Sequence, residues 1–220
     1  IAISVAYAGM NVKLLGTDEG IAAELNGGTH MSVEDVAVMR SIPNLLIYSP
    51  ADTVEFAKAI PQILAYEGPV YIRMQRKEQP VFHDETYAFD LFSADVCKEG
   101  KDVTIMTMGG IMPAEALRAV ALLKEQGIEA EYINVHTIKP LDEQTLLSSM
   151  KKTGCVVTCD NHNVIGGLGS AVAELAAKQY PLPIEMVGIQ DHFGEVGFLP
   201  YLKEKFHMRA EDIAAAAERV

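Results

Sequence analysis

Short apolar runs alternate with longer stretches of helical period along most of the chain. The short runs lack polar alternation, which is typical of strands buried on both faces of a sheet. The longer stretches carry apolar residues three and four positions apart, the spacing of one helix face. The predicted strands are residues 12–15, 45–48, 70–72, 103–108, 130–135, 155–158 and 184–189. The predicted helices are residues 32–40, 52–66, 112–126, 142–150, the segment after 170 up to 178, 199–206 and 210–219.

An irregular, charged stretch from about residue 77 to residue 100 divides this alternation into two halves. The pattern predicts an α/β fold of two three-layer domains with mostly parallel sheets. We expect a first domain at 1–80, a linker at 81–100 and a second domain at 101–220. Residues 1–8 look like the end of a helix whose beginning is missing, so the first domain is expected to be incomplete at its N-terminal side.

The acidic charge balance excludes several classes of partner. The formal net charge of −12 argues against nucleic acid and against an anionic membrane surface. No apolar run approaches the roughly 20 residues of a membrane-spanning helix. Three cysteines form no disulfide framework, which favours a reducing, cytoplasmic compartment. Cys155 and Cys159 lack a second pair of ligands, so we predict no metal site.

A glycine turn and a histidine stand between the first predicted strand and the first predicted helix. Gly27 and Gly28 allow a sharp turn, and Ser32 with Asp35 three positions later resembles a capping box. His30 is therefore expected in a loop at the carboxyl end of a strand, where open α/β sheets bind ligands. From these residues alone, an ordinary turn with a surface histidine is the favoured interpretation.

Two arginines follow the predicted strand 70–72. The guanidinium groups of Arg73 and Arg76 match a phosphate or sulfonate in shape and charge, although both side chains could also serve as surface ion-pair partners. The glycine pairs 109–110 and 166–167 match neither G-x-G-x-x-G nor a P-loop, so we interpret them as structural turns.

Several segments, taken in order, resemble the transketolase family. They correspond to its pyrimidine-binding domain and its C-terminal domain, and they cover nearly the whole chain. The matching segments are residues 16–21, 28–30, 35–44, 49–52, 69–76, 137–142 and 191–195.

The resemblance implies a thiamine diphosphate enzyme that transfers a two-carbon ketol unit from a ketose, phosphorylated or otherwise anionic, to an aldose. The glutamate that activates the cofactor in the family lies upstream of the part present here. The domain that binds the diphosphate with Mg²⁺ or Ca²⁺ is also absent. The chain therefore resembles the C-terminal subunit, or a fragment, of a split transketolase. The implied partner is an N-terminal subunit, with the cofactor shared at the interface and a dimer of heterodimers as the assembly.

The resemblance also assigns roles to individual residues. His30 matches the residue that faces the reacting carbon, and Arg76 matches the arginine that binds the sugar phosphate; Arg73 is a second candidate. Asp18 and Asn26 depart from the family, which usually has histidine and aspartate there. Both departures fall in the pocket lining, so we expect a substrate unlike the usual pentose phosphates, with Asp18 meeting hydroxyls and Arg76 meeting the anion.

Other functions remain open within and outside this fold. A 1-deoxyxylulose-5-phosphate synthase and the beta subunit of a 2-oxo acid dehydrogenase share the two-domain layout. A non-catalytic subunit that regulates another enzyme is a third possibility. His162 and His192 are expected to serve packing, capping or interface roles.

Overall fold

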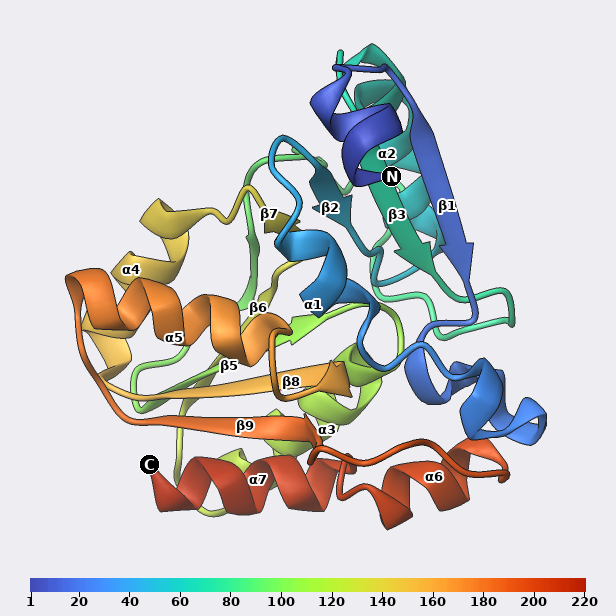
Figure 1. Ribbon diagram of the computed structural model, residues 1–220. Helices are drawn as coiled ribbons and strands as arrows, with labels where there is room; N and C mark the ends of the chain where they lie inside the picture. Colours follow the sequence, from blue (N-terminus) through green and yellow to red (C-terminus); the bar gives the residue numbers. More distant parts are fainter.

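The computed structural model describes residues 1–220 and contains two sheets that lie one above the other in Figure 1. The first sheet has four strands in the order β1-β3-β2-β7. Strands β1, β2 and β3 are parallel, and β7 pairs with β2 in the antiparallel sense. The bounds are β1 (Lys13–Thr17), β2 (Leu46–Tyr48), β3 (Val70–Met74) and β7 (Thr137–Lys139).

The second sheet has five strands in the order β4-β6-β5-β8-β9. Only its edge strand β4 is antiparallel to its neighbour. The bounds are β4 (Asp95–Lys98), β5 (Val103–Met108), β6 (Ala130–Asn134), β8 (Val156–Asn163) and β9 (Ile184–Ile189). The predicted α/β class with mostly parallel sheets in two units is confirmed.

Helices cover both faces of the second sheet. On one face, α3 (Met112–Glu125) and α7 (Ala210–Arg219) bury a cluster that includes Ile105 and Tyr132 of the sheet. On the other face, α4 (Glu143–Thr153) and α5 (Leu168–Gln179) bury a second cluster with Met106 and Met108. Consecutive residues of β5 therefore point to opposite cores, which explains why every residue of the strand is buried.

The first sheet is smaller and packs against α2 (Thr53–Ala65) through a third apolar cluster. The remaining helices are α1 (Asp35–Arg40) and α6 (Leu199–Lys205). A π-helical segment, Ala2–Tyr7, opens the chain, and two 3₁₀ segments, Gly20–Asn26 and Gly28–His30, connect β1 to α1. No helix is both long and apolar enough to cross a membrane.

The predicted capping box of Ser32 and Asp35 does not form, whereas α2 has a side-chain cap. The Asp52 carboxylate accepts a hydrogen bond from the backbone N–H of Glu55 at 2.8 Å and caps α2, which begins at Thr53, close to the predicted start at residue 52. Helix α1 begins at Asp35 rather than at Ser32 and has no side-chain cap. The Asp35 carboxylate is bound instead by two side chains of β3, Tyr71 and Arg73.

Two short strands were not predicted, and one of them, β7, links the halves of the chain. Strand β4 lies within the segment 81–100 and pairs with β6 of the second sheet. Strand β7 follows β6 in sequence but pairs with β2 of the first sheet. The rest of the connecting segment packs through Leu91 and Phe89 onto the apolar cluster beside α2. Through β7, the second half of the chain therefore contributes a strand to the first sheet.

Candidate functional site

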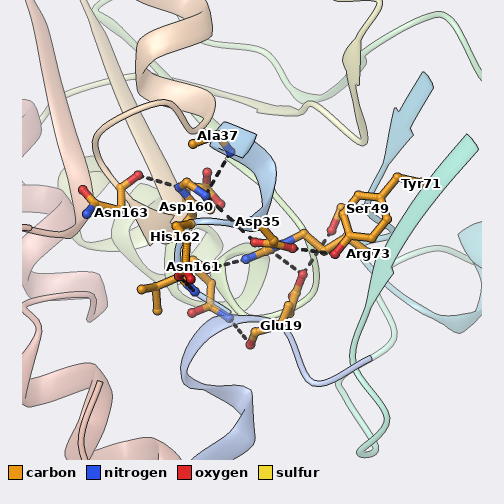
Figure 2. Close-up of polar contacts among 12 residues, drawn as sticks. Glu19, Asp35, Ala37, Ser49, Tyr71, Arg73, Asp160, Asn161, His162 and Asn163 are labelled. Carbon is orange, nitrogen blue, oxygen red and sulfur yellow. Dashed lines mark hydrogen bonds and ion pairs between the residues drawn. The ribbon is translucent and has the colours of Figure 1, made fainter. Parts of the chain in front are cut away.

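The strands of the first sheet deliver polar residues to their carboxyl ends, where β8 of the second sheet approaches. Glu19 follows β1, Ser49 follows β2, and Arg73 lies near the end of β3. Asn161 and His162 belong to β8. Figure 2 shows that these side chains converge on one another from the two sheets. Parallel strands place their carboxyl ends at one edge, so this convergence follows from the topology.

Arg73 is the centre of the convergence, and its side chain is only 1% exposed. Its Nη1 lies 2.6 Å from Oε2 of Glu19, and its Nε lies 2.8 Å from Oδ2 of Asp35. Its Nη2 donates to the backbone carbonyl of Asn161 at 2.7 Å. All three nitrogens of the guanidinium group are therefore engaged within the protein.

The charges in this cluster stabilise one another. Burial by itself would lower the pKa of Arg73, but the carboxylates of Asp35 and Glu19 outweigh it and raise that pKa, so the group stays charged. Burial raises the pKa of Glu19, opposed by the charge of Arg73. For Asp35, the Arg73 charge and hydrogen bonds from Arg73 and Tyr71 overcome burial and lower the pKa.

Glu19 also connects the cluster to neighbouring loops. Its carboxylate accepts hydrogen bonds from the hydroxyl of Ser49 at 3.1 Å and from the backbone N–H of Gly110 at 3.3 Å. The side chain of Gln75 approaches it at 3.4 Å. Gly109, which precedes Gly110, has a positive φ of 76°, a backbone conformation that favours glycine. The glycine pair 109–110 therefore forms a turn, as predicted.

Two β8 residues hold the segments that flank the predicted loop. The Asn161 amide donates to the backbone carbonyl of Glu19 at 2.9 Å and accepts from the N–H of Ile21 at 3.0 Å. His162 is placed to donate through Nδ1 to the carbonyl of Asn163 at 2.6 Å and to accept at Nε2 from the N–H of Ala37 at 3.3 Å. These two bonds require the neutral ring, so we treat its 3.9 Å approach to Asp35 as a dipolar contact and not an ion pair.

The structure gives Arg73 a different role from the predicted one. A substrate anion would have to displace Glu19 or Asp35 from a guanidinium group that is closed to solvent. The expected role of Arg73 in binding the substrate is therefore corrected to a structural role. Arg76, three residues later and beyond the end of β3, has a side chain that is 66% exposed. The alternative role that the sequence allowed for both arginines, a surface ion pair, describes Arg76 but not the buried Arg73.

Asp18 and Arg76 form a direct ion pair, which the sequence interpretation did not foresee. Nη2 of Arg76 lies 2.6 Å from Oδ2 of Asp18. The Asp18 backbone has a positive φ of 60°, which is uncommon outside glycine. Oδ1 of Asp18 is buried and has no hydrogen-bond partner. The sequence interpretation assigned separate ligands to Asp18 and Arg76, and the structure pairs the two side chains with each other.

His30 ends the second 3₁₀ segment and is exposed. The hydroxyl of Thr29 lies 2.9 Å from its Nδ1. Gly28 packs so closely on the loop at Gly194 that an added Cβ would lie 2.1 Å from the Gly194 carbonyl oxygen. The exposed Asn26 side chain has no hydrogen-bond partner within the chain, and neither it nor His30 contacts Asp18 or Arg76.

The sequence interpretation missed Glu19, Asp35 and Asn161 as members of the cluster. One signal was present, because Arg73 directly continues the apolar run 70–72 and a buried arginine requires carboxylate partners. The partners lie 54, 38 and 88 residues away in sequence, so only the fold identifies them. His162 does serve a packing and capping role in the structure, as expected.

Family comparison agrees with this architecture over both halves. The transketolase pyrimidine-binding domain family matches residues 1–81, and the transketolase C-terminal domain family matches residues 93–213. The two α/β units of this chain, which meet in the polar cluster, therefore correspond to the pyrimidine-binding and C-terminal domains of a thiamine-diphosphate enzyme. The chain belongs to the transketolase family.

Individual relatives include components of split transketolases. The chain is 54% identical over 220 residues to the 6-deoxy-6-sulfo-D-fructose transketolase subunit SqwH of Clostridium sp. (strain MSTE9), covering all of this chain and 68% of that one. It is 35% identical to one of the subunits of the apulose-4-phosphate transketolase of Actinobacillus succinogenes, covering 87% and 61%. A solved structure described as a split gene transketolase, inactive beta4 tetramer, matches with a TM-score of 0.90 and 40% identity, covering 100% and 69%. The chain thus spans roughly two thirds of the length of these relatives.

Replacing Arg73 with Met should destabilise the protein by about 3–5 kcal/mol, because it leaves the buried carboxylates of Glu19 and Asp35 without a counter-charge. Urea unfolding at pH 7, followed by circular dichroism, measures the difference. Arg76→Met is the matched control and should cost less than about 1 kcal/mol, because the Arg76 side chain is largely exposed. Equal losses in the two variants would contradict the structural role of Arg73.

Proposed function

We propose that the chain is the pyrimidine-binding and C-terminal portion of a split transketolase that moves a two-carbon ketol unit from an anionic ketose to an aldose. The observation that carries the proposal is the arrangement at the carboxyl edge of the first sheet. There a buried charge cluster fixes the loops, while His30 and the Asp18–Arg76 pair remain available to a ligand. The identity to components of split transketolases supports it.

The groups at this edge suit the substrate better than the metal-bound diphosphate of the cofactor. They comprise an imidazole, a guanidinium group and the unpartnered oxygen Oδ1 of Asp18, but no set of oxygen ligands for Mg²⁺. When bound, thiamine diphosphate supplies the nucleophilic carbon and the electron sink that cleavage of a ketose carbon–carbon bond needs. We assign its diphosphate and its Mg²⁺ or Ca²⁺ to an N-terminal partner subunit, with the cofactor shared at the interface.

We propose that His30 contacts the reacting part of the sugar. An imidazole can donate to a carbonyl or hydroxyl oxygen and can exchange a proton near neutral pH. Thr29 orients the ring through Nδ1, and this contact leaves Nε2 free to face the substrate. The close packing of Gly28 on Gly194 gives the short segment a fixed base. Asn26, at the other end of the same loop, is proposed as a contact for a sugar hydroxyl.

Arg76 and Asp18 are proposed to select the substrate together. Asp18 carries an unpartnered oxygen that suits a hydroxyl donor, while Arg76 keeps donors free beyond its bond to Asp18. Because Asp18 already partly neutralises Arg76, a strongly acidic terminus such as a sulfonate or phosphate is needed to compete for the guanidinium group. On the basis of its 54% identical relative, we propose 6-deoxy-6-sulfo-D-fructose as the ketose donor.

His30→Ala should lower the turnover number of the assembled enzyme by about 10²–10⁴, the range for a positioned proton-transfer group. Steady-state ketol transfer with the partner subunit and thiamine diphosphate measures the effect. His207→Ala is the matched control, since His207 is an exposed imidazole outside this edge and its loss should leave turnover unchanged. Near-normal turnover in His30→Ala would return His30 to the role of a surface residue.

Arg76→Ala should raise KM for the anionic ketose at least tenfold while changing kcat little, because it removes binding that substrate and transition state share. The neighbouring exposed cation Lys77 provides the control, and Lys77→Ala should change KM by less than twofold. Initial rates with the sulfonated ketose and its uncharged 6-deoxy analogue separate charge recognition from other effects. A KM increase of the same size for the uncharged analogue would contradict anion recognition by Arg76.

A further inference from the structure

A second cluster of ligand-type side chains lies away from the candidate site, where α2 meets β4. Glu55 of α2, His83 of the connecting segment and Asp95 of β4 each place one oxygen or nitrogen within 4.8 Å of the other two. The Glu55 side chain is fully buried, and His83 and Asp95 are mostly buried. The carboxylates of Glu55 and Asp95 form no ion pair with a lysine or an arginine.

The surroundings prepare these groups to act as ligands. The carboxylate of Asp52 lies 3.0 Å from Nδ1 of His83 and also accepts from the backbone N–H of His83 at 2.8 Å. A carboxylate that holds one ring nitrogen fixes the tautomer and leaves the lone pair on Nε2, the arrangement found behind histidines that bind metals. Glu55 accepts from Tyr48 and Asn134, and these bonds leave further lone pairs on its oxygens.

Two buried polar atoms beside the cluster lack any partner. Oδ1 of Asn134 and Nε2 of His136 make no hydrogen bond, although Asn134 is 1% exposed and His136 is 0% exposed. Nε2 of His136 lies 3.9 Å from Oδ2 of Asp95, so it is directed at the cluster. Asn134 donates its amide to Glu55 at 2.7 Å and therefore adjoins the same carboxylate. Unpaired buried polar atoms are costly and rare, which points to a missing ligand.

A cavity of about 420 Å³ adjoins the cluster, and its wall includes His83, Asp95 and Asn134. This space gives an ion and its water ligands a route to the carboxylates. With metal–ligand distances of about 2.1 Å, two ligands of a tetrahedral ion are about 3.4 Å apart. Because the three ligand atoms lie within 4.8 Å of one another, each pair must close by at most roughly 1.4 Å to hold the ion.

We propose that Glu55, His83 and Asp95 bind a divalent transition-metal ion, with Asn134 and His136 beside it as further ligands. Mixed imidazole and carboxylate ligands favour Zn²⁺ or Mn²⁺ over Mg²⁺. The ligands come from α2 beside the first sheet, from the connecting segment and from two strands of the second sheet, and His136 lies two residues after the end of β6. The ion therefore joins the two sheets. This role is independent of the proposed ketol transfer.

Metal titration of the intact protein tests the site. After removal of bound metal with a chelator, Zn²⁺ and Mn²⁺ are titrated separately by calorimetry, without thiamine diphosphate, partner subunit or substrate. We expect about one equivalent per chain, a dissociation constant in the micromolar range or below, and a higher melting temperature with the ion. Mg²⁺ should bind at least tenfold more weakly than the better of the two ions.

Variants assign the ion to these side chains. Asp95→Asn and His83→Gln should each weaken binding at least tenfold. Asp52→Asn should weaken metal binding about 10–100-fold, because the carboxylate that orients the His83 imidazole is lost. Asparagine can still cap the helix. Glu78→Gln is the matched control, because Glu78 is an exposed acid outside the cluster, a few residues before His83. This variant should bind the metal ion as tightly as the unaltered protein.

Two results would overturn the proposal. One is binding of less than about a tenth of an equivalent of both ions at 100 micromolar metal. The other is unchanged affinity in folded Asp95→Asn and His83→Gln, which would place the ion elsewhere. If a variant fails to fold, pulsed electron paramagnetic resonance of Mn²⁺ on the unaltered protein decides. Coupling to an imidazole nitrogen supports the site, and its absence contradicts it.

Discussion

The rest of the structure depends on the need to neutralise one buried arginine. An uncompensated guanidinium group costs several kcal/mol inside a protein, so Arg73 must have anionic partners wherever β3 places it. Glu19 after β1 and Asp35 at the start of α1 supply the charges, and the carbonyl of Asn161 supplies the last hydrogen bond. These partners come from both sheets, so satisfying one side chain sets how the two units meet.

This constraint also determines what remains for a ligand. Asn161 binds the backbone on both sides of Gly20, at the start of the segment that leads to His30. Gly28 is fixed by its close approach to Gly194. The segment between them therefore has anchored ends, and it exposes only Leu25 and Asn26. Buried charges hold the frame, while Asp18, Arg76 and His30 stay at its edge with unused hydrogen-bonding capacity.

Sequence patterns were sufficient where burial decides the structure and insufficient where long-range pairing does. The apolar run of β5 identified a central strand because both its faces are covered. Strands β4 and β7 were not predicted because they are short and partly polar. Both are edge strands that form only by pairing with a strand far away in the sequence. Asp35 looked like part of a capping box, yet a buried arginine competes more strongly for its carboxylate than a backbone N–H does.

For the candidate site too, local features could be predicted and long-range contacts could not. The glycine turn and His30 could be located locally, whereas only the fold separated buried Arg73 from exposed Arg76.

The central claim is that this portion of a transketolase acts only together with a partner that supplies the diphosphate-binding domain. Reconstitution tests it most directly. The protein, an N-terminal transketolase subunit and their mixture are each assayed with thiamine diphosphate, Mg²⁺, 6-deoxy-6-sulfo-D-fructose and an aldose acceptor, and cofactor binding is measured by calorimetry. The account predicts ketol transfer and tight cofactor binding in the mixture alone. Micromolar binding of thiamine diphosphate, or turnover, by the protein without its partner would contradict it.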